Sequence, residues 1–414
     1  MEARASLARH WILRELERCM RTEQLLCRDL DTRTIAARAL ERFSGTPDWI
    51  WVQFSAGYDT YALRRALVEA FPETALHGAS SCLGSMTNDG ASVGPGGAVG
   101  LLAFWDTEGD FGTVMVPFGE DPKQSAREAA IAAAEAAGRQ GEAPDIIWVS
   151  AVPGCEESII AGIEDFVGSE TPIYGGSAAD DDVSGHWSAF DSAGETRAGL
   201  VVSALFPSGT IGHAFQSGYA PAGPSATVTA AAGRRLEALD GRPARAVFDD
   251  WTGGQVVIGP PDTAASILAS STWSPLGRPD TMVADIPFFL LLHPAQAEAD
   301  GAITLFADVA PGDRLHLMAG GPDGLTARAA RTVTLAMEAG GISRNDLAGA
   351  LVIFCGGSML AMQSGMSEVA RQVDTALGGS PFLGGFTFGE QGRTISGQNC
   401  HGNLMISAVV FARS

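Results

Sequence analysis

The pattern of apolar and polar positions divides the chain into a short helical start and a long remainder in which strands and helices alternate. Residues 5–43 predict two helices, because apolar residues recur there at intervals of three and four positions. The first series runs from Leu7 to Leu16 and the second from Ile35 to Phe43. After residue 44, short apolar runs of strand length alternate with segments of helical periodicity. This alternation predicts an α/β fold.

The most informative feature is an internal repeat, in which a strand, a helix and a glycine-containing strand follow one another. Trp51 and Gly78 are 27 positions apart, and so are Trp148 and Gly175. The repeat occurs three times, in residues 48–80, 145–177 and 350–388. The strands that carry Trp51 and Trp148 should therefore occupy equivalent places in two similar β-α-β units.

Further strands and one clear helix complete the predicted fold. In that helix Asp121 is a suitable N-cap, Pro122 occupies the first position and the Ala-rich body ends at Gly138. The fold class is α/β, with layered mixed sheets covered by helices and built from repeated β-α-β units. The turn-forming string from Leu239 to Pro243 marks a boundary between two domains. The predicted parts are an N-terminal helical segment at 1–44 and domains at 45–240 and 241–414.

Composition and charge argue against several classes of protein. The 414 residues are 46% hydrophobic, so the chain can bury a large core. A formal net charge of −21 argues against binding to nucleic acid or to an anionic membrane surface. No secretory signal is visible, and the longest apolar run, at 286–292, is too short for membrane insertion. The six scattered cysteines form no Cys-x-x-Cys pair, which predicts reduced thiols in a cytoplasmic protein.

Short catalytic and metal-binding motifs are weak in this sequence. The Gly-rich stretch 94–100 lacks the ending of a phosphate loop, and 175–179 lacks the last glycine of a nucleophile elbow. Asp180, Asp181 and Asp182 could bind a hard cation, but three adjacent side chains on a strand cannot all face one point. The histidines form no closely spaced pair, although a single haem ligand needs none.

The most distinctive string runs from Gly384 to Glu390. Two glycines end a strand, Phe386 and Phe388 alternate along it, and a carboxylate follows. Aromatic walls with one fixed charge would suit a small polar ligand or a flat macrocycle. A core strand with inward-packed phenylalanines and a glutamate that caps a turn is the alternative interpretation.

The order of several strings resembles the FIST family, the paired FIST N and FIST C domains of bacterial signalling proteins. The resemblance covers residues 45–412 and rests on the strings 173–181, 218–223, 239–244, 293–294 and 385–390. Two departures stand out. Cys82 is displaced from its expected place in the first repeat, and Ser358 stands where arginine is expected.

The resemblance implies a sensor that binds a small ligand in the cytoplasm. Because the chain has no kinase or cyclase motif of its own, it would signal through a partner such as a histidine kinase or a cyclic-dinucleotide enzyme. A stand-alone branch resembles haem-dependent nitric-oxide sensors, so haem stays open although no cofactor is assigned. The axial ligand would be His401 or Cys400, with Arg393 as the nearest cation for the propionates.

Binding and catalysis remain competing classes of function. Cys82, Cys155 and Cys355 each follow a repeat strand, so a cysteine nucleophile is the strongest enzyme hypothesis. No residue is assigned as catalytic, and the sequence favours a binding protein, which needs only a pocket and a partner surface.

The pocket is expected where the strands with Gly78, Gly175 and Gly384 end, since glycine lets the backbone approach a ligand. The residues expected to bind the ligand are Ser177, Asp180, Cys82, Cys355, Phe386, Phe388, Glu390 and Arg393.

Overall fold

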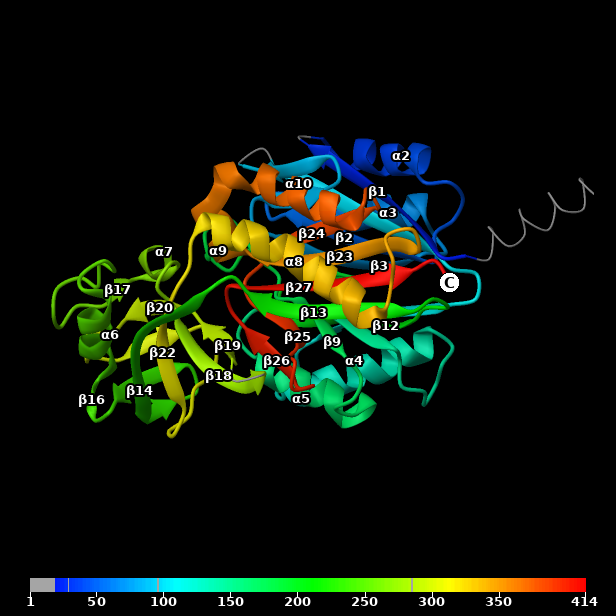
Figure 1. The fold of residues 1–414 in the computed structure, drawn as a ribbon. Helices are drawn as coiled ribbons and strands as arrows, with labels where there is room; N and C mark the ends of the chain where they lie inside the picture. The colour runs from blue at the N-terminus through cyan, green and yellow to red at the C-terminus, as the bar shows by residue number, and fades with distance from the viewer. Residues whose placement is uncertain (1–18, 29, 95–96, 284–285) are drawn as a thin grey trace, which may run out of the picture.

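Three units with a common order of elements make up most of the protein (Figure 1). The computed structural model describes residues 19–28, 30–94, 97–283 and 286–414. Each unit has the order β-α-β-α-β-β-β-β, and in the third unit the second helix is broken into shorter pieces. The first unit contains β1 (Arg21–Arg28), α2 (Thr32–Arg42), β2 (Trp49–Ser55), α3 (Thr60–Ala70), β3 (Ala75–Ser81), β4 (Gly84–Thr87), β5 (Gly90–Val93) and β6 (Ala98–Trp105).

The second and third units repeat this order. The second contains β7 (Asp110–Pro117), α4 (Pro122–Ala136), β8 (Ile146–Ala151), α5 (Glu156–Val167), β9 (Ile173–Gly176), β10 (Ala189–Phe190), β11 (Glu195–Thr196) and β12 (Gly199–Phe206). The third contains β13 (Ile211–Ser217), α8 (Pro322–Gly340), β23 (Leu347–Cys355), α9 (Gly356–Met362), η1 (Gln363–Gly365), α10 (Met366–Leu377), β24 (Phe382–Thr387), β25 (Glu390–Arg393), β26 (Asn399–Gly402) and β27 (Met405–Ala412).

The sheets of the three units share one strand order and one register. The orders are β1-β6-β2-β3, β7-β12-β8-β9 and β13-β27-β23-β24, and only the last two strands of each run are parallel. Trp51 pairs with His77 in β3, and Trp148 pairs with Tyr174 in β9 at the equivalent position. The two tryptophan rings meet nearly at right angles, with centroids 4.9 Å apart. The predicted repeat and the predicted α/β class are therefore confirmed.

The units also exchange hairpins. The hairpin β4–β5 of the first unit extends the sheet of the third unit beside β24, and β10–β11 of the second unit extends the first beside β3. The hairpin β25–β26 of the third unit extends the second beside β9. Each sheet thereby has six strands. Because the three exchanges form a closed cycle, no unit has a complete sheet without its neighbour.

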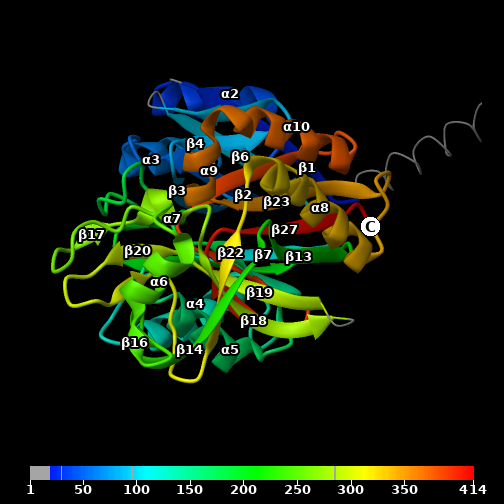
Figure 2. The ribbon, with the colours of Figure 1, turned by 60° about the vertical axis from the view of Figure 1, so that its left-hand side comes forward.

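The helices cover the outer faces of the sheets, and the inner faces meet in one core. Residues of α2 and α3 pack on one face of β2, and residues of α4 and α5 pack on β8 and β12. In Figure 2 these two helical layers lie at opposite ends of the view, with strands between them. Alternation along a strand places Ile50 and Val52 against helices and Trp49 and Trp51 in the central core.

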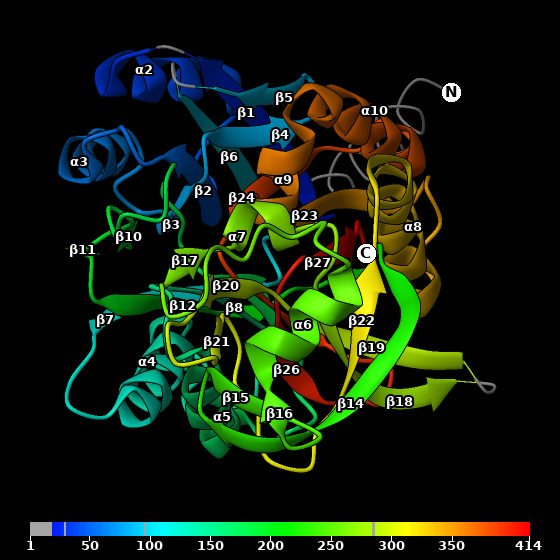
Figure 3. The same cartoon turned by 90° about the vertical axis from the view of Figure 1, so that its left-hand side faces the viewer.

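A mostly β insertion separates β13 from α8 in the third unit and faces the viewer in Figure 3. Its strands form a separate nine-stranded sheet with a hydrophobic core of its own. It contains β14 (Ala220–Ala232), β15 (Arg235–Leu239), β16 (Arg242–Pro243), α6 (Ala244–Thr252), β17 (Ala265–Ser266), α7 (Leu268–Ser271), β18 (Leu276–Val283), β19 (Ile286–Leu292), β20 (Pro294–Ala297), β21 (Ile303–Leu305) and β22 (Arg314–Ala319).

The structure changes the picture of the N-terminal segment. The helix predicted at 35–43 exists as α2, whereas the series from Leu7 to Leu16 lies outside the described residues. Residues 21–28 are not helical but form β1, which pairs with β6. The paired residues of β6 lie 70 to 84 positions further along the chain, from Arg28–Ala98 to Arg21–Trp105, so the local pattern of apolar residues could not reveal the pairing. Residues 21–42 are thus part of the first repeat unit.

The predicted boundary at residue 240 falls within the insertion, in the turn between the paired strands β15 and β16. The long strand β14 lies before this turn. Sheets that combine early and late parts of the chain connect the two predicted domains, since β24 pairs with β4 and β25 pairs with β9.

Candidate functional site

The ends of the three parallel strand pairs meet at one place. There each unit donates a backbone hydrogen bond to the next, in a closed cycle: Cys82 N–H to Phe386 O (2.9 Å), Phe388 N–H to Ser177 O (3.1 Å) and Ala179 N–H to Ser80 O (2.9 Å). Four of the residues expected to bind ligand, which lie far apart in the sequence, are thus brought together: Cys82, Ser177, Phe386 and Phe388.

The glycines at these strand ends make room for protein atoms rather than for a ligand. A Cβ added to Gly78 would lie 2.3 Å from the Phe190 ring, and one added to Gly384 would lie 2.6 Å from Met86. At Gly175, where φ is +146°, it would lie 1.9 Å from the Val149 carbonyl oxygen. The expectation that these glycines open the backbone to a ligand is therefore wrong, because protein atoms fill the space. At Gly78 and Gly384 these atoms belong to another unit, and at Gly175 they belong to the paired strand of the same unit.

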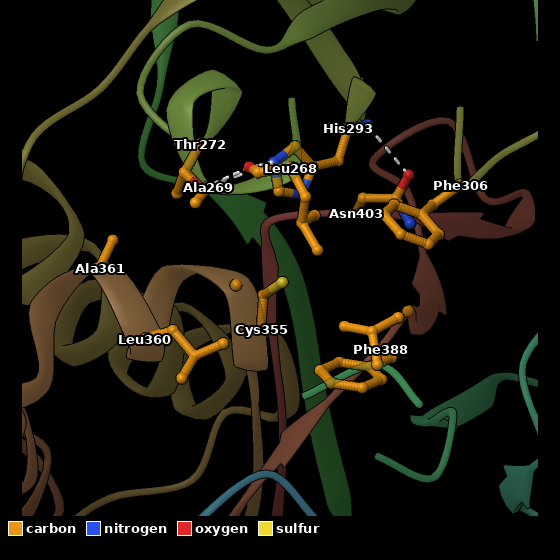
Figure 4. Close-up of a pocket in the computed structure, with 13 residues that line it drawn as sticks. Leu268, Ala269, Thr272, His293, Phe306, Cys355, Leu360, Ala361, Phe388 and Asn403 are labelled. Carbon is orange, nitrogen blue, oxygen red and sulfur yellow. Dashed lines mark hydrogen bonds between the residues drawn. The ribbon is translucent and has the colours of Figure 1, made fainter. Parts of the chain in front are cut away.

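A cavity of about 190 Å³ lies beside this junction, between the insertion and the third unit. The insertion contributes apolar side chains from Leu268, Ala269 and Phe306, and the third unit contributes those of Leu360, Ala361 and Phe388. In Figure 4, Leu268 and His293 lie on one side of the cavity and Cys355, Leu360 and Phe388 on the other. Of the eight residues expected to bind ligand, Cys355 and Phe388 line it.

The polar groups of the cavity wall are uncharged. They belong to Thr272, His293, Cys355 and Asn403. His293 Nε2 lies 2.9 Å from the Leu268 carbonyl oxygen, so this nitrogen carries the hydrogen and donates it. Burial lowers the pKa of His293 to about 4, and the ring is neutral at pH 7. The cavity can therefore hold a mostly apolar molecule and offer it a few hydrogen bonds.

Glu390 lies one residue beyond the cavity wall and is fully buried. Its two carboxylate oxygens accept hydrogen bonds from Thr387 Oγ1 and from the Met405 N–H, each at 3.0 Å. Burial outweighs these bonds and raises its pKa to about 7. Glu390 therefore fixes the turn after β24 from inside the core, and its carboxylate does not line the cavity.

Glu390→Gln should flatten the pH dependence of stability. The folded protein holds the Glu390 proton up to about pH 7, whereas the unfolded chain releases it near pH 4.3. Stability from the protonated form is complete below about pH 4 and is lost as pH rises through about 7. Between pH 5 and 8, wild type should lose about 2 to 3 kcal/mol more unfolding free energy than the variant.

This comparison can be made by denaturant titration at several pH values. The glutamine leaves one hydrogen bond mismatched, and that cost is the same at every pH. The exposed control Glu73→Gln should follow the wild-type profile. Parallel profiles for wild type and Glu390→Gln would show that Glu390 is ionised throughout this range.

Ser177 and His401 belong to a buried ionic cluster behind the cavity. Glu156, 1% exposed, accepts hydrogen bonds from Ser177 Oγ (2.7 Å) and from Arg234. Glu157 lies 3.1 Å from Arg234 Nη2 and 3.0 Å from His401 Nδ1. The acids belong to α5, His401 to β26 and Arg234 to the turn between β14 and β15 of the insertion. The cluster therefore joins the second unit, the third unit and the insertion.

Charges within this cluster balance one another. Burial alone would lower the pKa of His401, but the carboxylates of Glu156 and Glu157 raise it. The pKa of Glu157 is lowered, because its hydrogen bond to His401 and the charges of His401 and Arg234 outweigh burial. Glu156, Glu157 and His401 have the spacing of metal ligands, but the Arg234 guanidinium already supplies a cation there.

Asp180 has a structural role in the loop after β9. Its carboxylate accepts hydrogen bonds from the backbone N–H groups of Val183 (2.6 Å) and His186 (2.7 Å). Asp181 accepts one from the Leu83 N–H at 2.8 Å. These contacts fix the loop that brings Val183 to the cavity wall, and the carboxylate of Asp180 does not itself line the cavity.

The residues proposed for haem do not fit that group. His401 Nδ1 contacts Glu157, and its Nε2 lies 3.4 Å from the Asn403 amide. Cys400 Sγ contacts the Gly392 carbonyl at 3.6 Å, and Arg393 binds Glu170 and the Ser169 carbonyl. None of these side chains lines the cavity, whose 190 Å³ is below the roughly 300 Å³ of pockets for drug-sized ligands.

The three candidate nucleophiles are not activated. Burial raises the pKa of the Cys82 and Cys355 thiols and raises that of Cys155 to about 11. The thiolate is the reactive form of cysteine, so a higher pKa lowers its population at neutral pH. Phe386 is fully buried, with its ring centroid 6.5 Å from that of Phe354, and Cys82 contributes a backbone hydrogen bond. Of these four residues only Cys355 lines the cavity.

Sequence reasoning missed the half of the cavity that the insertion provides. On this wall only His293 belongs to a string of the family resemblance, the pair His293–Pro294, whereas Leu268, Thr272 and Phe306 belong to none. Their local sequence carries no signal, because the cavity forms only where the insertion packs on the third unit. The family string around His293 was the one clue that could have led to this wall.

The sequence matches the FIST N domain family over residues 48–242 and the FIST C domain family over residues 244–393. The chain therefore belongs to the FIST family, whose domains bind small ligands as sensors in signal transduction. No curated protein matches the sequence. Among the described helices, none is both long enough and apolar enough to cross a bilayer.

Two solved structures are distantly similar. One is a cyanuric acid hydrolase from A. caulinodans, with 10% identity, coverage of 95% of this chain and 100% of the other, and a TM-score of 0.40. The other is PurLQS from Thermotoga maritima, with 8% identity, coverage of 95% and 73%, and a TM-score of 0.21. These scores are too low to support a conclusion about this chain.

Proposed function

We propose that this protein is a cytoplasmic sensor that binds a small molecule between its insertion and its third repeat unit. The observation that carries the proposal is the cavity itself, whose walls come from both parts of the chain. A ligand there contacts α7 and His293 on one side and α9 and Phe388 on the other. Its binding free energy therefore depends on how the insertion sits on the third unit.

That dependence gives the site a means of signalling. If the insertion can sit on the third unit in more than one arrangement, a ligand that makes closer contacts with both parts in one of them shifts the population of molecules toward that arrangement. The change would be read by a partner such as a histidine kinase or a cyclic-dinucleotide enzyme, as the family membership suggests. Cys27, Cys82, Cys155, Cys355 and Cys400 form no disulfide, which supports a reducing, cytoplasmic location.

Filling the cavity should abolish ligand binding without unfolding the protein. Ala361 lines the cavity and is exposed, so Ala361→Phe should place a ring in the ligand space. A thermal-shift screen of small molecules would first find ligands of the wild-type protein. At a concentration about 100 times its Kd, such a ligand stabilises the folded state by about 2.7 kcal/mol. In Ala361→Phe this stabilisation should disappear.

Ala136→Phe is the matched control, because it makes the same substitution at an exposed position of α4 outside the cavity wall. It should keep the ligand-induced shift. A ligand that stabilises wild type and Ala361→Phe equally would place the binding site elsewhere and overturn the proposal.

A further inference from the structure

We propose that the cavity selects a small, uncharged, ring-sized molecule that donates one O–H or N–H hydrogen bond to Nδ1 of His293. The inference rests on the proposed sensor function and adds the chemical class of the ligand. Three observations carry it: the uncharged wall, the volume, and a histidine nitrogen that has no hydrogen-bond partner within the described part of the protein.

The wall excludes a charged ligand. The residues that line it include no Asp, Glu, Lys or Arg. Glu390, next to Gly389 of the wall, is directed to Thr387 and Met405. Asp180 accepts hydrogen bonds from the backbone of its own loop, and the ionic cluster beyond Asn403 is already paired. The ammonium and carboxylate of a free amino acid would lose their hydration here without gaining a counter-charge. A zwitterion is therefore a poor ligand for this cavity.

The volume limits the ligand to about one ring. An engineered protein cavity of about 150 Å³ with apolar walls binds benzene. The cavity between the insertion and the third unit is somewhat larger, at 190 Å³, and has Phe306 and Phe388 in its wall. It has room for a six-membered ring with a polar substituent, and flat rings pack well against phenylalanine side chains.

His293 provides the specific polar contact. Nε2 donates its hydrogen to Leu268, which leaves Nδ1 as an acceptor, and Nδ1 has no hydrogen-bond partner among the described residues. The ring is 3% exposed and lies over Gly357, which also lines the cavity. A ligand without a donor would displace water from Nδ1 and leave this acceptor unpaired, whereas a ligand with a donor satisfies it and gains affinity. The neighbouring Thr272 hydroxyl already donates to Leu268 at 3.1 Å.

Phenol, indole and anisole can test this inference on the full-length protein. Phenol and indole each combine a ring with one donor, whereas anisole has a similar shape to phenol and no donor. Calorimetric titration should show phenol binding at least about tenfold more tightly than anisole, because the acceptor stays unpaired with anisole. Phenylalanine, a zwitterion, should show no binding.

His293→Phe should remove the preference for phenol over anisole, and His316→Phe, the same substitution at a histidine outside the cavity wall, should keep it. Circular dichroism confirms that each variant is folded. If the wild-type protein binds phenol and anisole equally, the role of His293 is wrong, but the cavity remains a ligand site. Tight binding of phenylalanine, a zwitterion, would overturn the inference that the ligand is uncharged. Failure of all ring probes would overturn this inference, while the Ala361→Phe comparison would still decide the proposed function.

Discussion

Replacing Arg234 with methionine is expected to lower the free energy of unfolding by about 3 to 5 kcal/mol, because it leaves a buried carboxylate without its main cation. The Glu156 side chain is 1% exposed, and Arg234 is its direct charged partner. Burial of Glu156 favours its neutral form, and the charges of His401 and Arg234 together keep its pKa low. Without Arg234, the folded protein must either protonate Glu156 or bury its charge.

The measurement is denaturant unfolding at neutral pH, with Arg235→Met as the control. Arg235 is the next residue, and its partner Asp300 is largely exposed, so its loss should cost at most about 1 kcal/mol. Adding Glu156→Gln to Arg234→Met should recover part of the lost stability, because the unpaired charge is then removed. If Arg234→Met is as stable as Arg235→Met, the cluster does not hold the insertion against the second and third units.

Gly175→Ala is expected to destabilise the protein by at least about 4 kcal/mol, a loss found only for severe steric or packing defects. The new Cβ would lie 1.9 Å from the Val149 carbonyl oxygen, and backbone atoms cannot move aside as a flexible side chain can. The residue also has φ of +146°, which L-residues with a Cβ rarely adopt. The pairing of β8 with β9 would have to break locally.

Gly57→Ala provides the comparison for this variant. A Cβ at Gly57 has no atom within 4 Å, and its φ lies outside the region that favours glycine. Its unfolding free energy should be close to that of wild type or slightly higher. Thermal or denaturant unfolding of Gly175→Ala and Gly57→Ala measures the two changes in unfolding free energy. A mild effect at Gly175 would mean that the close approach between β8 and β9 relaxes easily.

The sequence by itself determined the class of fold and the existence of the repeat. Strand and helix periodicity are local properties of a chain, and equal spacing of Trp51–Gly78 and Trp148–Gly175 is visible without any knowledge of packing. The observed register places these residues in equivalent strand pairs. The same local signals identified α2 and the helix α4 between the first two repeats.

Only the tertiary structure decided how the repeats combine and where a ligand can bind. Strand β1 and the three exchanged hairpins pair with partners that are distant in the sequence, and hydrogen bonds between distant strands leave no periodic signal. Glycines that the sequence associated with a ligand instead accommodate closely packed protein atoms, of a neighbouring unit at Gly78 and Gly384 and of the paired strand at Gly175. The cavity arises where the insertion meets the third unit, so its polar wall at His293 follows from the packing of two surfaces and not from any motif.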